Sequence, residues 1–176
     1  MRPKKESLSP KDSPIFGVGL RSEHYPFLET KPKLEIDYFE IITENHLTSR
    51  GRPFEMLELI RRDYPISFHG VSLSIAYHQP PREEYLKKLK EFISLIDPFL
   101  VSDHLCWTGE GHANLHNLLP IAYNQENLNF LANRIDQVQS YLGREMAFEN
   151  LSAYFDYKQS SMSEWEFVSA LIEKAG

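Results

Sequence analysis

Residues 99–104 read Phe-Leu-Val-Ser-Asp-His, a short apolar run that ends in an acid and a histidine. Three further runs have the same form: an apolar core of strand length, followed at once by a side chain that can bind a metal or a proton. These runs end at Glu44, His69 and Glu149. Helix-like segments separate the runs, and strands that alternate with helices favour a parallel sheet. Because the carboxyl ends of parallel strands open on one side of a β/α fold, the pattern predicts that these side chains share one site.

Strands and helices are expected to alternate along the rest of the chain. We expect five strands, at residues 15–20, 38–42, 66–68, 100–102 and 146–148. Between them apolar residues recur at helical spacing, most regularly from residue 85 to 96. Asn124 and Gly143 have the residue types of a helix start and a helix end, and they bound a further expected helix. Residues 107–123 are rich in Gly, His and Asn and are expected to form a long loop.

This alternation indicates an α/β fold of the barrel type, which repeats the strand-helix unit eight times when closed. The chain holds about five such units. We therefore interpret residues 14–176 as the N-terminal part of a single barrel domain, truncated before the sixth strand. Residues 1–13 are polar and are expected to be a disordered tail.

The composition excludes several classes of protein. A formal net charge of -6 provides no basic surface for nucleic acid. No apolar segment approaches the roughly 20 residues that cross a membrane, so no membrane partner is expected. Cys106 is the single cysteine, which rules out an internal disulfide framework and makes the cytoplasm the expected location.

Two imidazoles and two carboxylates at the strand ends would form a mixed nitrogen and oxygen site. Such a donor set suits Fe(II), Mn(II) or Zn(II). Either His69 or His104 alone would more often be a hydrogen-bonded core residue, and the convergence of several groups favours a site. Glu149 follows apolar residues and is expected to be partly buried, where a carboxylate needs a partner.

Three polar residues near these strand ends have two open interpretations each. Asp103 and Asn150 adjoin candidate ligands, and each would either orient an imidazole or cap a turn or helix. His116 lies in the expected long loop and would either line the site or be solvated. Cys106 is expected to pack rather than react, since no neighbouring base marks it as a nucleophile.

Several segments together resemble the multinuclear non-haem iron-dependent oxidative enzymes, long catalogued as an uncharacterised protein family. The resemblance rests on Gly17-Val18-Gly19-Leu20-Arg21, Glu44-Asn45, His69-Gly70-Val71-Ser72-Leu73-Ser74, Ser102-Asp103-His104-Leu105-Cys106-Trp107, Leu118-Leu119-Pro120 and Phe148-Glu149-Asn150. It covers nearly all of the chain after the polar tail.

The resemblance implies a TIM (β/α)8 barrel of the xylose-isomerase-like type, with two or three iron ions at the carboxyl ends of the strands. It also implies oxidation, by O2, of a ribosomally made precursor peptide, often at cysteine, with a partner protein that recognises the peptide. By motif, His69 and His104 are expected as iron ligands and Glu149 as a carboxylate bridging two metals. Glu44, Asp103 and Asn150 would line the site or support its ligands. The family continues into further ligand-bearing strands, so this chain is expected to hold only part of the site.

Two other functions remain open on the sequence. One is a metal-dependent sugar isomerase or phosphodiester hydrolase with a similar barrel, which would need no O2. The other is a truncated and inactive remnant, or a subunit that needs a separate C-terminal piece to complete its metal site.

Overall fold

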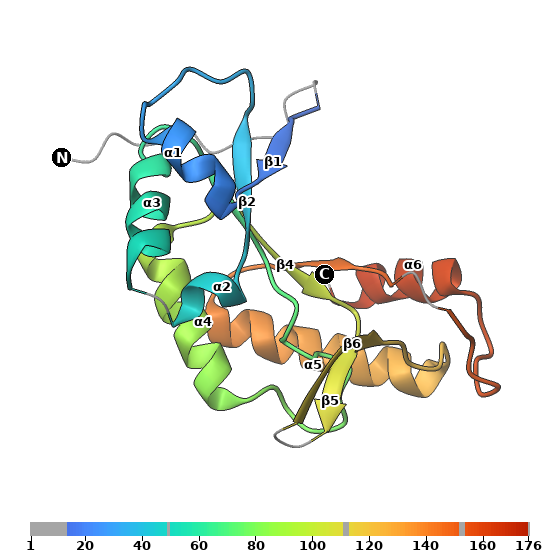
Figure 1. The fold of residues 1–176 in the computed structure, drawn as a ribbon. Coiled ribbons are helices and arrows are strands. Elements are labelled where there is room, and N and C mark those ends of the chain that lie inside the picture. The colour runs from blue at the N-terminus through green and yellow to red at the C-terminus, as the bar shows by residue number, and fades with distance from the viewer. Residues whose placement is uncertain (1–13, 49, 111–112, 152–153, 176) are drawn as a thin grey trace. The chain divides into compact units, whose positions relative to one another are not determined.

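A computed structural model describes residues 14–48, 50–110, 113–151 and 154–175, and Figure 1 shows its fold. The predicted disordered tail, residues 1–13, lies outside the described residues. The described chain forms two compact units. The first comprises the described residues up to His69 together with Glu91–Val101, and the second comprises Gly70–Lys90 and the described residues from Ser102 onward.

The five predicted strands form one sheet. They are β1 (Gly17–Gly19), β2 (Tyr38–Ile42), β3 (Ile66–His69), β4 (Leu100–His104) and β7 (Ala147–Glu149), in the order β1-β2-β3-β4-β7. The pairs β1–β2, β2–β3 and β4–β7 are parallel. A parallel sheet whose strands alternate with helices confirms the predicted α/β class, and it agrees with part of a barrel. The prediction of a single barrel domain over residues 14–176 stays a prediction.

Helices occupy the segments between the strands. They are η1 (Ser22–His24), α1 (Tyr25–Leu28), α2 (Glu44–Leu47), α3 (Arg52–Ile60), α4 (Glu83–Ile96), α5 (Gln125–Leu142) and α6 (Glu164–Ala175). The two predicted ends of α5 are confirmed. The Asn124 side chain accepts a hydrogen bond of 2.9 Å from the Asn127 amide, and Gly143 ends the helix with φ at 75°. No described helix is long and apolar enough to cross a membrane.

In the first unit, side-chain alternation along β3 sets the direction of its last residue. The Phe68 ring stacks on Phe92 of α4 with 4.5 Å between ring centroids, so this side of the strand packs against the helix. Successive side chains of a strand point to opposite sides, which turns His69 away from α4. In the register of β2 and β3, His69 stands beside Ile42.

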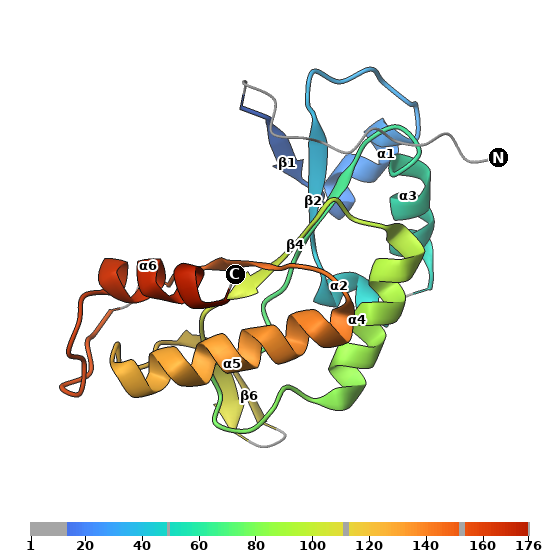
Figure 2. The same ribbon diagram turned by 180° about the vertical axis from the view of Figure 1, so that it is seen from behind.

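In the second unit, α5 and α6 lie side by side in both Figure 1 and Figure 2. Apolar residues that recur at helical spacing along α5 are buried, and they are Leu128, Leu131, Ile135, Val138 and Leu142; Ala132 and Arg134 are buried as well. The buried side chains of α6 are Phe167 and Leu171. β4 and β7 pair in a register that sets Asp103 beside Phe148 and His104 beside Glu149. The two candidate ligands therefore stand on neighbouring strands at the same level.

The predicted long loop over 107–123 is wrong, because most of it is a hairpin. β5 (Trp107–Glu110) and β6 (Ala113–Leu119) pair as a separate antiparallel sheet. The Gly, His and Asn residues that suggested a loop lie within or between two short strands. A hydrogen bond of 2.8 Å from the Trp107 indole N–H to the Pro120 carbonyl joins the open ends of this hairpin.

Candidate metal centre

His104, the last residue of β4, is held by a backbone carbonyl. Its Nδ1 lies 3.1 Å from the Gly70 carbonyl oxygen, and the side chain is buried. A carbonyl oxygen only accepts hydrogen bonds, so this contact places the imidazole proton on Nδ1. Nε2 then carries a lone pair. A histidine fixed in this way by its second nitrogen is the usual arrangement of a metal ligand.

The Nε2 atom of His104 faces the carboxylate of Glu149, with 3.6 Å between Nε2 and Oε2. This distance exceeds the roughly 2.7–3.2 Å of a good hydrogen bond. In the neutral ring with its proton on Nδ1, both facing atoms are acceptors, and a cation between them would be bound by both. The pair therefore has the chemistry of two metal ligands.

Glu149 is more exposed than its sequence suggested. We expected a partly buried carboxylate, but 58% of its side chain is accessible to solvent. The reason is its strand: β7 stands last in the order of the sheet, and among the described strands only β4 pairs with it. The apolar residues before Glu149 do not indicate how many strands pair with β7.

His69 completes a group of three. It ends the first segment of the first unit and is joined by a peptide bond to Gly70, the first residue of the second unit. One ligand atom from each of His69, His104 and Glu149 lies within 4.8 Å of the other two. Ligand atoms about 2.1 Å from one ion are at most about 4.2 Å apart. The three residues are therefore a candidate metal group.

Gly70 and Asp103 form the support behind His104. A Cβ at Gly70 would overlap Oδ2 of Asp103, so only glycine fits there without movement. The buried Asp103 carboxylate accepts a hydrogen bond of 2.7 Å from the His104 amide and one of 3.2 Å from the Leu73 amide. The Gly70 amide in turn donates to the Ser102 carbonyl over 2.7 Å. These bonds fix the chain around the carbonyl that orients His104.

The structure locates the other predicted site residues as follows. Glu44 is the first residue of α2 in the first unit. The Asn150 amide donates to Glu164 Oε1 over 2.9 Å, so it links the end of β7 to the start of α6. His116 lies in β6, and its side chain is outside the described residues. The imidazole of His104 is oriented by the Gly70 carbonyl, a backbone group that sequence reasoning missed because every residue has one.

Cys106 and His46 are buried as well. Burial, together with the nearby Asp103 charge, raises the pKa of the Cys106 thiol to about 12. The thiol therefore stays protonated at neutral pH and packs, as expected. His46 of α2 is buried against Phe92, with 6.3 Å between ring centroids, and burial lowers its pKa. Its ring is therefore neutral at physiological pH.

Comparison with known proteins gives both a family and close relatives. A family model described as "RiPP precursor modification enzyme MbnB/TglH/ChrH" matches residues 15–176; RiPP denotes a ribosomally synthesised and post-translationally modified peptide. A UPF0276 protein of Anaeromyxobacter sp. (strain Fw109-5) is 42% identical over 160 residues, which cover 90% of this chain and 56% of that protein. A UPF0276 protein of Acaryochloris marina (strain MBIC 11017) is 41% identical over 159 residues, with coverage of 90% and 57%. The chain thus spans little more than half the length of these relatives.

Solved structures agree with the fold. A D-allulose 3-epimerase from Methylomonas sp. superposes with a TM-score of 0.50 at 10% identity, covering 80% of this chain and 49% of that one. A D-psicose 3-epimerase from Clostridium cellulolyticum H10 superposes with a TM-score of 0.50 at 12% identity, covering 89% and 60%. At such low identity the likeness concerns the fold alone. It confirms part of a xylose-isomerase-like TIM barrel.

Proposed function

Since the chain belongs to the MbnB/TglH/ChrH family of RiPP precursor modification enzymes, we propose that it carries part of an iron site for the O2-dependent oxidation of a precursor peptide. The observation that carries the proposal is the group of His69, His104 and Glu149 at the carboxyl ends of three strands. Because the chain spans 56% of a curated relative's length, the activity of the whole protein is part of the proposal.

The donor atoms fit iron. Two imidazole nitrogens and one carboxylate oxygen form the set that non-haem Fe(II) takes in oxygenases, and they leave coordination positions open. A bound iron ion would supply the redox centre for oxidation of the peptide by O2. Glu149, with two oxygens and a solvent-accessible side chain, would also suit a bridge between two ions. The further ligands of a second or third ion would come from beyond the described residues.

The protein's own groups prepare this site before any metal binds. The Gly70 carbonyl holds the proton of His104 on Nδ1, so that Nε2 is ready as a ligand. The negative charge of Glu149 offsets part of the charge of a cation. The accessible side of Glu149 leaves room for a peptide, and we infer that a cysteine of this peptide is the group modified. A separate protein that recognises the precursor remains part of the proposal.

Mass spectrometry of a co-produced peptide tests this function. The substrate to try is a short cysteine-containing peptide encoded beside the gene of this protein. With iron and air, the proposal expects a mass change in the peptide that is lost without O2 and lost in His104→Ala. His78→Ala alters an exposed histidine in a loop and serves as the matched control.

Two results would count against the proposal. A peptide of unchanged mass after reaction with the iron-loaded protein in air would exclude the oxidation. The same mass change with and without O2 would instead indicate hydrolysis, a metal-dependent alternative that needs no oxidant.

A further inference from the structure

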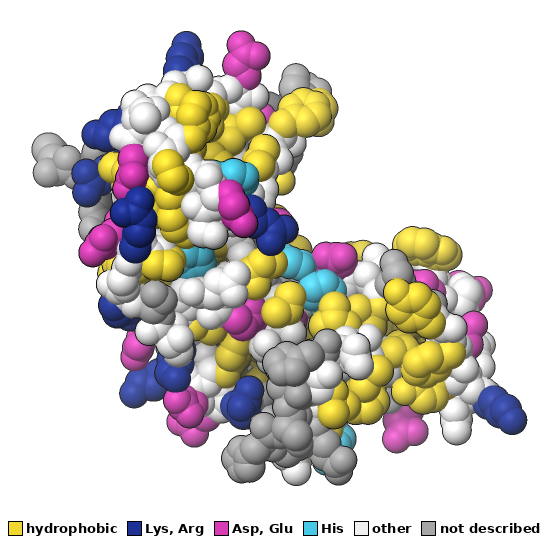
Figure 3. Space-filling model, in the orientation of Figure 1, with side chains coloured by type: hydrophobic (Ala, Val, Ile, Leu, Met, Phe, Trp, Pro, Cys, Tyr) yellow, Lys and Arg dark blue, Asp and Glu magenta, His cyan; other side chains and the backbone are white. Residues whose placement is uncertain are grey.

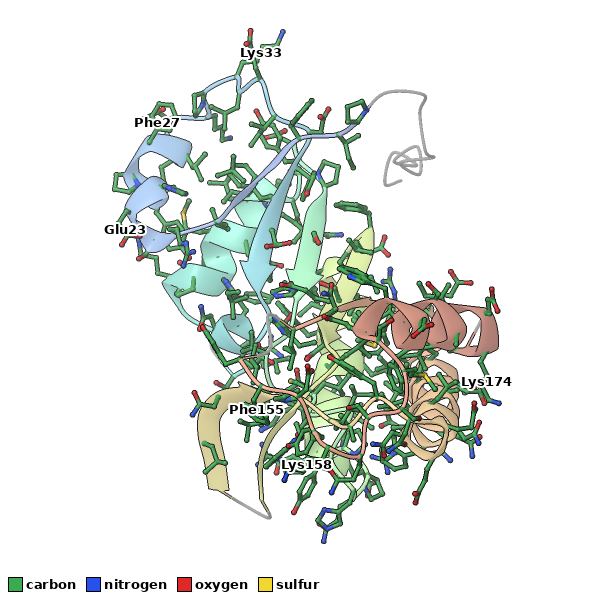
Figure 4. The ribbon with its side chains drawn as sticks, turned by 90° about the vertical axis from the view of Figure 1, so that its right-hand side faces the viewer. Glu23, Phe27, Lys33, Phe155, Lys158 and Lys174 are labelled. Atoms are coloured by element: carbon green, nitrogen blue, oxygen red, sulfur yellow. The ribbon has the colours of Figure 1, made fainter. Side chains whose placement is uncertain are left out.

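Among the described strands, the β5–β6 hairpin has an open edge in the same unit as His104. β5 begins at Trp107, three residues after His104. β5 is covered on its other side, because the Thr108 amide donates to Ser74 Oγ over 2.9 Å and the Cys106 carbonyl accepts from the Ala76 amide over 3.0 Å. β6 pairs only with β5 among the described strands. Figure 4 shows the hairpin apart from α5 and α6. Lys174, near the end of α6, is labelled there.

The middle of β6 is also poorly matched by β5. Trp107 pairs with Leu119 and Gly109 pairs with Asn114, so Thr108 alone stands opposite residues 115–118. This irregularity lies on the side of β6 that faces β5. On the other side of β6 no described strand pairs with it, and an edge of this kind is a template for pairing with another extended chain.

The surroundings of this edge suit an apolar and uncharged chain. Leu115 and Leu118 of β6 are 49% and 38% exposed. Between residues 105 and 123 the only Asp, Glu, Lys or Arg is Glu110. Figure 3 shows hydrophobic side chains gathered on the surface of the molecule, and in the same unit Tyr154 is fully exposed and Phe155 half exposed. Phe155 and Lys158 of this segment are labelled in Figure 4.

We propose that an extended peptide segment binds by adding to the outer edge of β6 as a third strand. Naming this segment as part of the precursor peptide rests on the function proposed above. Backbone hydrogen bonds would provide the binding energy, and apolar side chains of the peptide would contact the exposed leucines. At about 3.4 Å per residue, the seven residues of β6 offer an edge about 24 Å long. The hairpin that carries this edge begins three residues after His104.

Hydrogen exchange on the whole chain tests the proposal. The probe is a synthetic eight-residue peptide of alternating valine and threonine with a lysine at each end, and its twin carries N-methyl groups on alternate backbone amides. We expect the first peptide to slow exchange at residues 113–119. The methylated twin, which cannot pair along a strand edge, should leave exchange unchanged.

Matched variants add a second readout. Leu118→Lys should weaken peptide binding about tenfold, because a charge on a strand edge opposes pairing and the leucine contact is lost. Leu95→Lys changes a leucine that is 43% exposed on α4 and should not alter the affinity. Leu115→Lys replaces Leu118→Lys if the latter unfolds, as judged by circular dichroism.

Three results would overturn the proposal: no binding at millimolar peptide, protection only outside residues 113–119, or equal binding of the methylated twin. Iron content measured on the same samples separates this question from the proposed function. Peptide binding without iron binding would reject the metal site alone, and iron binding without peptide protection would reject the strand addition alone.

Discussion

Replacing Gly70 with alanine should weaken both the fold and the support of His104. The added methyl would overlap Asp103 Oδ2 and would lie 3.1 Å from Asp103 Cγ and 3.4 Å from the Ser102 carbonyl oxygen. Relief requires movement of a buried carboxylate that accepts two amide hydrogen bonds. Overpacking of this kind costs about 1–3 kcal/mol. Loss of one hydrogen bond to a charged group costs about 1.5–3 kcal/mol.

We therefore expect Gly70→Ala to lower the free energy of unfolding by about 2–4 kcal/mol, since rotation of the carboxylate relieves part of the overlap. The assay is urea unfolding followed by circular dichroism. Gly19→Ala is the matched control, because a Cβ at Gly19 meets no atom within 4 Å. A loss below about 0.5 kcal/mol for Gly70→Ala, the level of a neutral surface change, would refute the reasoning.

Three further predictions concern buried and capping groups. The Cys106 thiol, with its pKa raised to about 12 by burial, should resist a thiol reagent in the folded protein and react once urea unfolds it; fast labelling of the native protein would contradict this. Burial lowers the pKa of His46, so its neutral ring stabilises the fold fully above the unfolded pKa of about 6.5, and this stabilisation is lost as the pH falls through the lowered folded value. His46→Phe should reduce the loss of stability between neutral and acidic pH, whereas the exposed His78→Gln should leave it unchanged. Asn124→Ala should cost about 1 kcal/mol in urea unfolding through loss of the N-cap of α5, and an unchanged midpoint would exclude that role.

Much of the fold was predictable because its signals are local. Each strand of the parallel sheet is a short apolar run, so it can be recognised from its own residues without knowledge of the strand that pairs with it. The Asn124 cap and the Gly143 end of α5 follow from side-chain and backbone preferences at single positions. The group of His69, His104 and Glu149 followed from one rule of topology, that parallel strands end on the same side.

The features that were missed depend on atoms far apart in sequence. The orientation of His104 comes from the carbonyl of Gly70, and a carbonyl has no sequence signal of its own. The exposure of Glu149 depends on which strand stands beside β7. The hairpin of β5 and β6 was hidden because residues typical of loops fill two short strands, and pairing decided their structure.

Binding of Fe(II) measured by anaerobic equilibrium dialysis and elemental analysis tests the central claim, that His69, His104 and Glu149 form a metal site. The protein should retain iron, and His104→Ala and Glu149→Ala should each lose most of it while remaining folded by circular dichroism. His78→Ala should retain as much iron as the unaltered protein. Undiminished iron in both His104→Ala and Glu149→Ala would contradict the assignment of these residues as ligands.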